Sequence, residues 1–308
     1  MKLVIFGCGK IANRIARSCL LVKEIDLVGF ASKDPEKAKA YSETYGCRDC
    51  GDYDHFLDSD VDAVYIAVYN PGHYDLIRRC LTRRKHVICE KPMLFSLEQN
   101  KEMFSLAKEN GVILMEALKS VFLPLNIRIR EMIREERIGK IREIYASFMR
   151  NGSHGGDHWI SDPVCGGALS DLGSYCIGTM NFLMDKQPRL LSLESDRSGE
   201  KADSTAYVEV DYDGVKGRAA VSNSRDGDMT LIVTGERGFI RADDFWKSGE
   251  GFYELDGERF AIHEELISDF YYELKHFADL VDQGKKISDV MDKRASDLIL
   301  KITQAGLK

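Results

Sequence analysis

The chain has 308 residues, of which 44% are hydrophobic, and its formal net charge at pH 7 is −7. This length exceeds what one hydrophobic core usually supports, so two domains are expected. The acidic balance argues against a general nucleic-acid-binding protein, and no apolar run is long enough for a membrane span. Eight cysteines scattered through predicted strands and helices indicate reduced thiols. We therefore expect a cytoplasmic protein that binds a small molecule.

The first 115 residues alternate apolar strands with helical patterns. Strands are predicted over residues 2–6, 25–31, 61–68, 86–89 and 112–115, and helices over about 10–20, 35–45, 74–84 and 96–110. Asp34 and Ser96 stand where side-chain caps of two of these helices are expected. Such alternation predicts a doubly wound parallel sheet with right-handed crossovers.

The pattern changes after Pro124. A helix is predicted over 125–137, followed by strands over 141–149, 189–195, 205–211, 215–221, 229–234 and 239–242, and by helices over roughly 266–283 and 288–306. Asp213-Gly214 and Asp256-Gly257 lie between alternating runs, which is a strong hairpin signal. The second half is therefore predicted to form a large, mostly antiparallel open sheet within an α+β domain.

A glycine turn, Gly7-Cys8-Gly9-Lys10-Ile11-Ala12, follows the first strand and opens the first helix. In a dinucleotide-binding turn, Gly7 permits the tight bend, Gly9 lets the backbone approach a pyrophosphate, and Ala12 keeps the helix close to its strand. The helix N-terminus then faces the anion with free amides. We interpret the turn as a dinucleotide site; the alternative is a purely structural glycine turn.

Residues after the second and third strands bear on the choice of cofactor. NAD enzymes usually place an acidic residue at the end of the second strand, whereas this chain has Ser32 and Lys33, which suit a 2′-phosphate. We therefore expect NADP in preference to NAD; alternatively, Lys33 is simply solvated. Asn70 and His73 follow the third strand and either bind the cofactor ribose or cap the next helix.

Two further segments carry candidate chemistry. Glu90-Lys91-Pro92 closes the strand over 86–89, where a lysine would point into the crevice in which such sheets bind ligands. In the segment from Gly166 to Tyr175, Asp171 and Tyr175 would share one face if the segment is helical. Its small residues either allow close approach to a cofactor or serve helix packing.

The glycine turn, Glu90-Lys91-Pro92 and the segment Gly-Gly-Ala-Leu-Ser-Asp-Leu-Gly-Ser-Tyr, in this order and at these separations, resemble the glucose-fructose oxidoreductase and inositol dehydrogenase (Gfo/Idh/MocA) family. Tyr175, Asp162-Pro163 and the run Leu114-Met115-Glu116-Ala117 are similar to its glucose-fructose oxidoreductase and dimeric dihydrodiol dehydrogenase branch. The resemblance implies Lys91 and Tyr175 as the catalytic pair, with Asp171 as their neighbour, and a homodimer or higher homo-oligomer formed through the C-terminal sheet.

With this resemblance, the expected architecture is α/β. It comprises a Rossmann dinucleotide-binding domain over 1–119, a substrate and oligomerisation α+β domain over 120–285, and a C-terminal helix over 286–308 that packs back on the first domain. Glu90 and Lys91 are also expected to bind the cofactor, together with the residues of the glycine turn and those after the second and third strands. The expected activity is hydride transfer between nicotinamide and a carbon bearing a hydroxyl or carbonyl of a sugar, polyol or related molecule.

The physical roles agree with this assignment. Oxidising an alcohol requires removal of the hydroxyl proton, and a phenol with a pKa near 10 is a poor base at neutral pH unless a cation stabilises its phenolate. Lys91 would supply that charge for Tyr175, and Asp171 would position the substrate or Lys91. The alternatives are a dinucleotide-binding regulatory protein without turnover and a redox-assisted, NAD-dependent glycosidase.

The chain departs from the branch at Lys119 and Val121, where the branch carries a Trp and an Arg. An ammonium in place of an aromatic wall disfavours dihydrodiols and favours a more polar or anionic sugar, unless Lys119 faces solvent. The expected carbohydrate-like substrate side of the site comprises Lys119, Arg150, His154, His158 and Trp159. No metal is expected there, because the loop around His154 and His158 lacks a fourth ligand and hydride transfer needs none.

Overall fold

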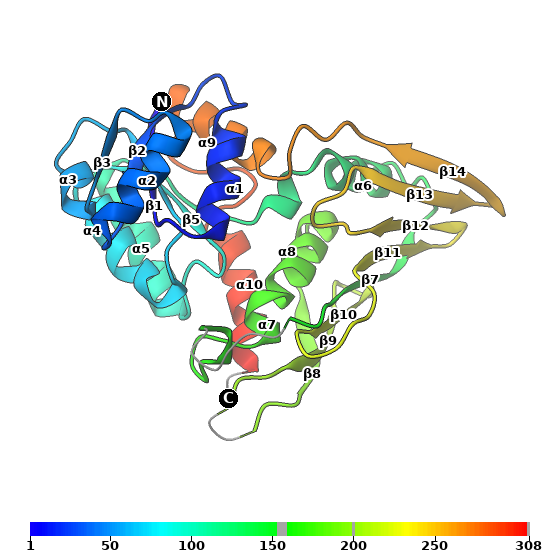
Figure 1. Ribbon diagram of the computed structural model, residues 1–308. Coiled ribbons are helices and arrows are strands. Elements are labelled where there is room, and N and C mark those ends of the chain that lie inside the picture. Colours follow the sequence, from blue (N-terminus) through cyan, green and yellow to red (C-terminus); the bar gives the residue numbers. More distant parts are fainter. Residues whose placement is uncertain (153–158, 199–200, 307–308) are drawn as a thin grey trace. The chain divides into compact units, whose positions relative to one another are not determined.

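The structure, a computed structural model, describes residues 1–152, 159–198 and 201–306 (Figure 1). The chain forms two compact units. The first comprises Met1–Ala117 with Phe270–Lys293, and the second comprises Leu118–Asp269 with the residues from Arg294 onward. The last helix therefore groups with the second unit, and its expected contact with the first domain stays a prediction.

The first unit contains a six-stranded parallel sheet in the order β3-β2-β1-β4-β5-β6. Its strands are β1 (Lys2–Phe6), β2 (Asp26–Ala31), β3 (Asp49–Gly51), β4 (Ala63–Ile66), β5 (His86–Glu90) and β6 (Leu114–Ala117). The strand order reverses between β1 and β4, and ligands of open α/β sheets bind beyond the carboxyl ends of strands at such a point. The predicted doubly wound sheet is confirmed.

Helices complete this unit: α1 (Lys10–Cys19), α2 (Pro35–Tyr45), α3 (Tyr53–Leu57), the 3₁₀ turn η1 (Asn70–Gly72), α4 (His73–Thr82), α5 (Leu97–Asn110) and α9 (Tyr271–Asp282). The capping predictions are confirmed, because the Asp34 side chain accepts from Lys37 N and Ser96 Oγ accepts from Gln99 N. Val4 and Phe6 of β1 belong to a buried cluster with residues of α3, α4 and α5. Side chains alternate along a strand, so Leu3 and Ile5 face the opposite side of the sheet.

The second unit contains an eight-stranded sheet in the order β14-β13-β12-β11-β7-β10-β9-β8. Its strands are β7 (Ile141–Met149), β8 (Arg189–Ser195), β9 (Thr205–Asp211), β10 (Lys216–Ser222), β11 (Thr230–Gly235), β12 (Gly238–Asp243), β13 (Glu250–Leu255) and β14 (Glu258–His263). Only the β7–β10 pair is parallel among these described strands. Both Asp-Gly hairpins are present, with positive φ at Asp213 (57°) and Asp256 (52°).

The helical elements of the second unit are η2 (Lys119–Phe122), α6 (Pro124–Arg134), η3 (Trp159–Ser161), α7 (Ala168–Asp171), α8 (Gly173–Met184) and α10 (Lys293–Ala305). Helix α8 packs on β7 and β10, and α6 packs on α8. Along β9 the side chains of Val208 and Val210 are buried while Tyr207 is exposed, so the sheet has one covered face and one open face.

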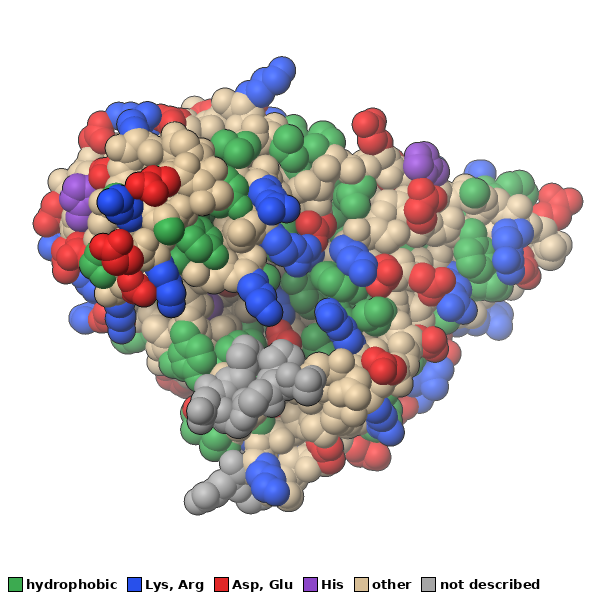
Figure 2. Space-filling view, in the orientation of Figure 1, with side chains coloured by type: hydrophobic (Ala, Val, Ile, Leu, Met, Phe, Trp, Pro, Cys, Tyr) green, Lys and Arg blue, Asp and Glu red, His purple; other side chains and the backbone are tan. Residues whose placement is uncertain are grey.

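On the face shown in Figure 2, acidic and basic side chains are interspersed over the first unit. Several charged side chains of this unit are paired between elements: Arg79 of α4 pairs with Asp54 of α3, and Arg83 lies 3.3 Å from Asp58. The surface charges of this unit are therefore in part compensated locally. Among the helices of the described residues, none combines the length and apolarity that a membrane span requires.

Candidate active site

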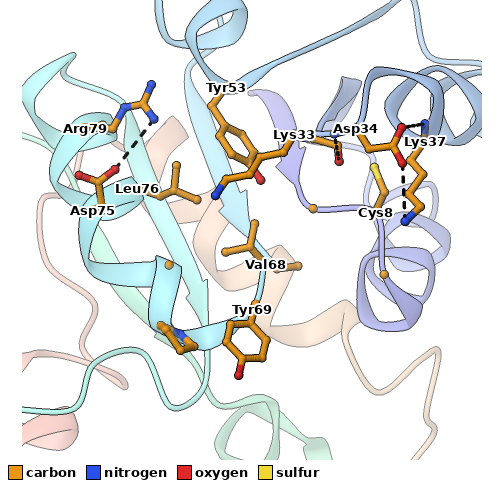
Figure 3. Close-up of a pocket in the computed structure, with 16 residues that line it drawn as sticks. Cys8, Lys33, Asp34, Lys37, Tyr53, Val68, Tyr69, Asp75, Leu76 and Arg79 are labelled. Atoms are coloured by element: carbon orange, nitrogen blue, oxygen red, sulfur yellow. Dashed lines mark hydrogen bonds and ion pairs between the residues drawn. The ribbon is translucent and has the colours of Figure 1, made fainter. Parts of the chain in front are cut away.

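A cavity of about 850 Å³ lies in the first unit at the carboxyl ends of β1, β2 and β4 (Figure 3). It is lined by Gly7, Cys8, Gly9, Ser32, Lys33, Asp34, Lys37, Tyr53, Ala67, Val68, Tyr69, Pro71, Gly72, Asp75, Leu76 and Arg79. The predicted glycine turn and the predicted Ser32-Lys33 pair thus border the same space. This is the position at which doubly wound sheets bind dinucleotides.

Gly7 and Gly9 are glycines for different reasons. At Gly7 the backbone has φ +116°, and a Cβ there would lie 2.4 Å from the carbonyl oxygen of Ala67, so folding itself requires glycine. Gly9 is the N-cap of α1 with an ordinary φ of −108°, and a Cβ there would meet nothing within 4 Å. The space over Gly9 is therefore open to a ligand, which fits a pyrophosphate at the N-terminus of α1.

The rest of the predicted turn has other surroundings. Ala12 is fully buried in the packing of α1, as its small size requires, whereas Lys10 and Ile11 are exposed and do not line the cavity. The Cys8 thiol does line it, and burial raises the pKa of Cys8 to about 11. At neutral pH Cys8 is therefore a neutral thiol that adds no negative charge where phosphates would bind.

The two lysines that follow β2 have different surroundings. Lys33 reaches across the cavity beside the ring of Tyr53 (Figure 3). Lys37 instead lies 3.7 Å from the Asp34 carboxylate, which also accepts from the Lys37 backbone N–H. Ser32 Oγ accepts from Asp34 N at 3.1 Å. Asp34 is thus engaged as the cap of α2, and Lys33 is the cation at this end that extends into the cavity.

Arg79 and Tyr53 line the same cavity and were missing from the sequence prediction. Arg79 comes from α4 and is held by Asp54 and by Asp75, the latter at 4.0 Å. Neither residue stands in a recognisable motif, and α3, which begins at Tyr53, is too short for its periodicity to be read. The only sequence signal was the basic pair Arg78-Arg79 on a predicted helix, which equally suits a solvated face.

Asn70 and His73 are not among the residues that line the cavity, and they contact the loop that carries Lys91. Asn70 Nδ2 donates to the carbonyl oxygens of Lys91 and Pro92, each at 3.4 Å. His73 Nδ1 lies 3.2 Å from the carbonyl oxygens of Pro92 and Met93, and Nε2 lies 3.2 Å from that of Val68. Neither side chain caps α4, whose N-cap is Gly72 without a side-chain bond, so the capping interpretation is wrong.

His73 is 1% exposed, and burial lowers its pKa to about 4. The ring is therefore a neutral imidazole at neutral pH, with one N–H to donate. Its contacts link the end of β4 to the segment after β5. His73 therefore acts as a structural tie for the Lys91 loop.

Glu90 and Glu116 fasten the same loop from the sheet side. The Tyr65 hydroxyl donates to Glu90 Oε1 at 2.9 Å, and Glu116 Oε1 accepts from Met93 N at 3.0 Å. The Lys91–Pro92 peptide bond is cis. The backbone around Lys91 is thus held by side chains from β4, η1, α4 and β6.

Asp171 and Tyr175 lie in the second unit, on two helical pieces that meet at Leu172. Helix α7 ends at Asp171, and α8 begins at Gly173. The backbone N–H of Tyr175 donates to Leu172 O, and Ser174 Oγ donates to the Asp171 carbonyl oxygen at 2.7 Å. The predicted helix is therefore interrupted between the two candidates, and Tyr175 stands in the first turn of α8.

The glycines before this helix serve packing within the second unit. A Cβ on Gly166 would lie 2.4 Å from the Trp159 carbonyl oxygen. Gly167 has φ +108°, and a Cβ there would lie 2.1 Å from the Asp203 carboxylate. That carboxylate accepts from Leu169 N and pairs with Arg197 at 3.3 Å. For Gly166 and Gly167 close packing is the interpretation supported, and for the other small residues of the segment both interpretations stay predictions.

Tyr175 is 9% exposed and packs in an aromatic cluster. Its ring centroid is 5.8 Å from that of Phe148 on β7 and 5.8 Å from that of Trp246, and Phe148 and Trp246 stack at 4.9 Å. Lys119 Nζ lies 4.6 Å from the Trp246 ring and forms an ion pair with Asp269. Lys119 is 2% exposed, so the alternative in which it faces solvent is wrong.

The remaining substrate-side candidates are distributed as follows. Arg150 is exposed after β7, and its backbone N–H bonds to Ser222 O at 2.9 Å. Trp159 begins η3 and is half-buried. His154 and His158 lie outside the described residues. Lys91 and Tyr175 belong to different units, so their pairing stays a prediction.

Comparisons with known proteins agree over most of the chain. Residues 1–118 match the profile of an oxidoreductase family with an NAD-binding Rossmann fold, and residues 127–241 match the GFO/IDH/MocA C-terminal domain. Trans-1,2-dihydrobenzene-1,2-diol dehydrogenase of Mus musculus is 29% identical over 99% of this chain and 95% of its own length. The human enzyme of the same name is 26% identical over 91% of this chain and 87% of its own length.

Solved structures share the fold. An aldose-aldose oxidoreductase from Caulobacter crescentus, complexed with glycerol, superposes with a TM-score of 0.91 at 21% identity, covering 99% of this chain and 96% of that one. KijD10, a 3-ketoreductase from Actinomadura kijaniata in complex with NADP and TDP-benzene, gives a TM-score of 0.89 at 23% identity, with the same coverage.

Proposed function

This chain belongs to the GFO/IDH/MocA family of NAD(P)-binding oxidoreductases, and we propose that it transfers a hydride between NADP and a carbon bearing a hydroxyl or carbonyl in a sugar, polyol or related molecule. The observation that carries the proposal is the fastening of the Lys91 loop at the carboxyl end of β5, next to the cofactor cavity. A protein that only binds a dinucleotide has no need of a fixed lysine there.

The cofactor half of the proposal is supported by the open space over Gly9 and by the charge beyond β2. The backbone amides of the turn from Gly7 to Gly9 would hold the pyrophosphate. Ser32 and Lys33 would hold the 2′-phosphate, because a cation and a small hydroxyl suit that group where NAD enzymes carry a carboxylate. Asn70 and His73 would act indirectly, through the loop of Glu90 and Lys91.

A bound nicotinamide supplies a hydride acceptor or donor and leaves the proton to the protein. When an alcohol is oxidised, its carbon loses a hydride while its oxygen loses a proton. Tyr175 would take that proton at its phenolic oxygen and return it in the reduction. Lys91 would favour the phenolate by its positive charge and orient the substrate oxygen, and Asp171 would position the substrate or Lys91.

The carbohydrate-like substrate class is supported by two similarities. The mammalian relatives are named for a vicinal diol of a six-membered ring, and the Caulobacter structure is named for aldoses. Both substrates present a secondary alcohol on a ring or chain of similar size. Arg150, His154, His158 and Trp159 are proposed to surround such a molecule, with Tyr175 at the reacting carbon. Lys119 is proposed to act on this side of the site through the Trp246 ring.

The test combines cofactor binding with turnover. NADPH and NADH are titrated by fluorescence into cofactor-stripped protein, which is then assayed with a panel of aldoses, polyols and trans-1,2-dihydrobenzene-1,2-diol. Tyr175→Phe and Lys91→Ala are expected to lower kcat by about a hundredfold or more. Tyr175→Phe should leave the NADPH Kd within about twofold, since the lost hydroxyl belongs to the substrate side. Tyr74→Phe, which removes a phenolic hydroxyl that donates to Glu102 at 2.8 Å outside the cavity, and Lys101→Ala, on the outer face of α5, are the matched controls.

Wild-type turnover in both Tyr175→Phe and Lys91→Ala would refute the catalytic assignment. Tight NADPH binding without turnover on the panel would favour a regulatory dinucleotide-binding protein. Glycoside cleavage with retained nicotinamide and no net absorbance change would favour the redox-assisted glycosidase.

We further propose a homodimer or higher homo-oligomer that assembles through the open face of the C-terminal sheet. That face carries exposed Tyr207 together with charged cross-strand pairs such as Lys216 with Glu209 at 2.8 Å. Light scattering of the purified protein tests this directly, and a monomer at assay concentration would contradict it.

A further inference from the structure

The second unit buries an ion pair behind the aromatic cluster that contains Tyr175. Lys119 of η2 is 2% exposed and pairs with Asp269, whose side chain is 16% exposed. Burying an ammonium is costly unless a carboxylate or other acceptor compensates it, so the two charges depend on each other. The two residues lie 150 positions apart in the sequence, and their contact is made by the fold.

The pair reaches Tyr175 through one indole ring. Lys119 Nζ lies 4.6 Å from the Trp246 ring centroid, and the Trp246 ring lies 5.8 Å from that of Tyr175. Phe148 stacks on Trp246 with an interplanar angle of 26°. A second ammonium, that of the exposed Lys247, lies 4.8 Å from the same ring and 3.5 Å from the Asp244 carboxylate. Each of these two lysines therefore lies beside a carboxylate.

We propose that the Lys119–Asp269 pair is a specificity-determining device: it fixes the indole of Trp246 and compensates the ammonium, so that the site beside Tyr175 selects neutral polyhydroxy compounds over anionic ones. This reverses the preference for an anionic sugar that Lys119 predicts from sequence alone. It rests on the proposed function in that Tyr175 is taken to meet the substrate. Lys119 and Asp269 are positioning residues, since they act through Trp246 and through the charge they leave at its ring.

The first experiment measures selectivity. D-glucose and D-glucuronate share a ring and differ at C6, where a hydroxymethyl group is replaced by a carboxylate. Asp269→Asn removes the compensating charge and keeps the side-chain shape. The ratio of kcat/KM for glucuronate to that for glucose is expected to rise about tenfold or more, because the loss of one negative charge makes the surroundings of the Lys119 ammonium more positive and a low-dielectric site then attracts an anion. Lys119→Met/Asp269→Asn should return the ratio to within about threefold of wild type.

Asp256→Asn is the matched control, because it removes a carboxylate from the same unit at an exposed pair with Arg237. It should leave the ratio unchanged. A folded Asp269→Asn protein whose ratio equals that of wild type would overturn the proposal. A rise of the same size in the control would overturn it too, since the effect would then be one of net charge.

A second experiment needs no turnover, so it separates failure of this inference from failure of the proposed function. The chain has two tryptophans, and Trp159→Phe leaves Trp246 as the single tryptophan, which is excited selectively over tyrosine. Lys247→Met in the same background leaves Lys119 as the lysine that the described structure places on this ring. Quenching by the anion iodide is then compared with quenching by neutral acrylamide. The iodide-to-acrylamide ratio should rise at least about twofold in Asp269→Asn, fall in Lys119→Met, which leaves the Asp269 carboxylate, and return to the starting value in Lys119→Met/Asp269→Asn.

If Asp269→Asn does not fold, the Lys119→Met variant still decides the matter. A compensated pair predicts a lower iodide-to-acrylamide ratio once the Lys119 ammonium is removed, because the Asp269 carboxylate that remains repels iodide. An unchanged ratio in Lys119→Met would show that the pair sets no charge balance at the indole, and the proposal would be wrong. Absence of turnover on every substrate, with these quenching results as expected, would count against the proposed function and leave the charge pairing in place.

Discussion

Adding one methyl group to either glycine of the first turn should affect different properties: at Gly7 the stability of the fold, and at Gly9 the binding of the cofactor. Gly7→Ala forces a non-glycine residue to φ +116° and places its Cβ 2.4 Å from the Ala67 carbonyl oxygen. Such a φ alone costs about 1–3 kcal/mol, and the clash with backbone adds to it. We expect the free energy of unfolding to fall by about 3 kcal/mol or more in Gly7→Ala, measured by urea denaturation with circular dichroism.

Gly9→Ala should behave in the opposite way. Its φ of −108° suits any residue, and its Cβ would meet no atom within 4 Å. The poorer N-cap and the stiffer unfolded chain offset each other, so stability should stay within about 1 kcal/mol of wild type. The methyl group would occupy the space expected for a pyrophosphate, so the NADPH Kd should rise about tenfold or more, equivalent to about 1.4 kcal/mol. A Gly9→Ala protein that binds NADPH like wild type would refute the reasoning, as would a Gly7→Ala protein of unchanged stability.

Two further predictions concern charge and pH. Lys33→Ala should weaken NADPH binding about tenfold while changing NADH binding little. Lys37→Ala should have the smaller effect, because the Lys37 ammonium is paired with Asp34. Fluorescence titration with both nucleotides measures these effects, and equal losses for the two nucleotides would contradict the assignment of Lys33 to the 2′-phosphate. Burial lowers the pKa of His73 from 6.5 to about 4. Between these pH values the unfolded chain takes up a proton at this residue that the folded chain does not. The free energy of unfolding should therefore fall by up to about 3 kcal/mol from this group as the pH decreases through this window. The pKa of His86 is lowered to about 4 as well. His73→Asn should therefore remove only part of the loss of stability between pH 7 and pH 4.5, measured by urea denaturation at both pH values. An unchanged loss of stability would count against a neutral buried His73.

Local sequence signals proved sufficient for most of the fold. Helix α2 begins and ends as predicted because Asp34 caps it and Pro35 fits its first turn. The hairpins at Asp213 and Asp256 follow from residues that tolerate positive φ. Strand β3 and helix α3 were not predicted, because they comprise three and five residues and neither is long enough to display a period.

The candidate site was less predictable, because its side chains act across long sequence separations. Gly7 and Gly9 were identified from their spacing, but only the structure distinguishes a glycine required by Ala67 from one that leaves space for a ligand. Asn70 and His73 were placed near the right loop by strand order, yet their bonds to carbonyls some twenty residues away have no local signature. Lys119 was noticed as an unusual residue, but its partner Asp269 follows no pattern in the sequence.

The two proposed catalytic residues are held in place by different kinds of interaction, and this has a consequence for mutational work. The Lys91 carbonyl accepts from Asn70, and the carbonyls that follow it contact His73, so the position of this loop should respond to the loss of single hydrogen-bonding groups. Tyr175 is held by ring packing against Phe148 and Trp246, where loss of volume matters more than loss of a polar atom. A distant substitution that lowers kcat is therefore more informative when its polarity and its volume are varied separately. Asparagine for His73 and leucine for Phe148 are the substitutions that isolate each kind of support.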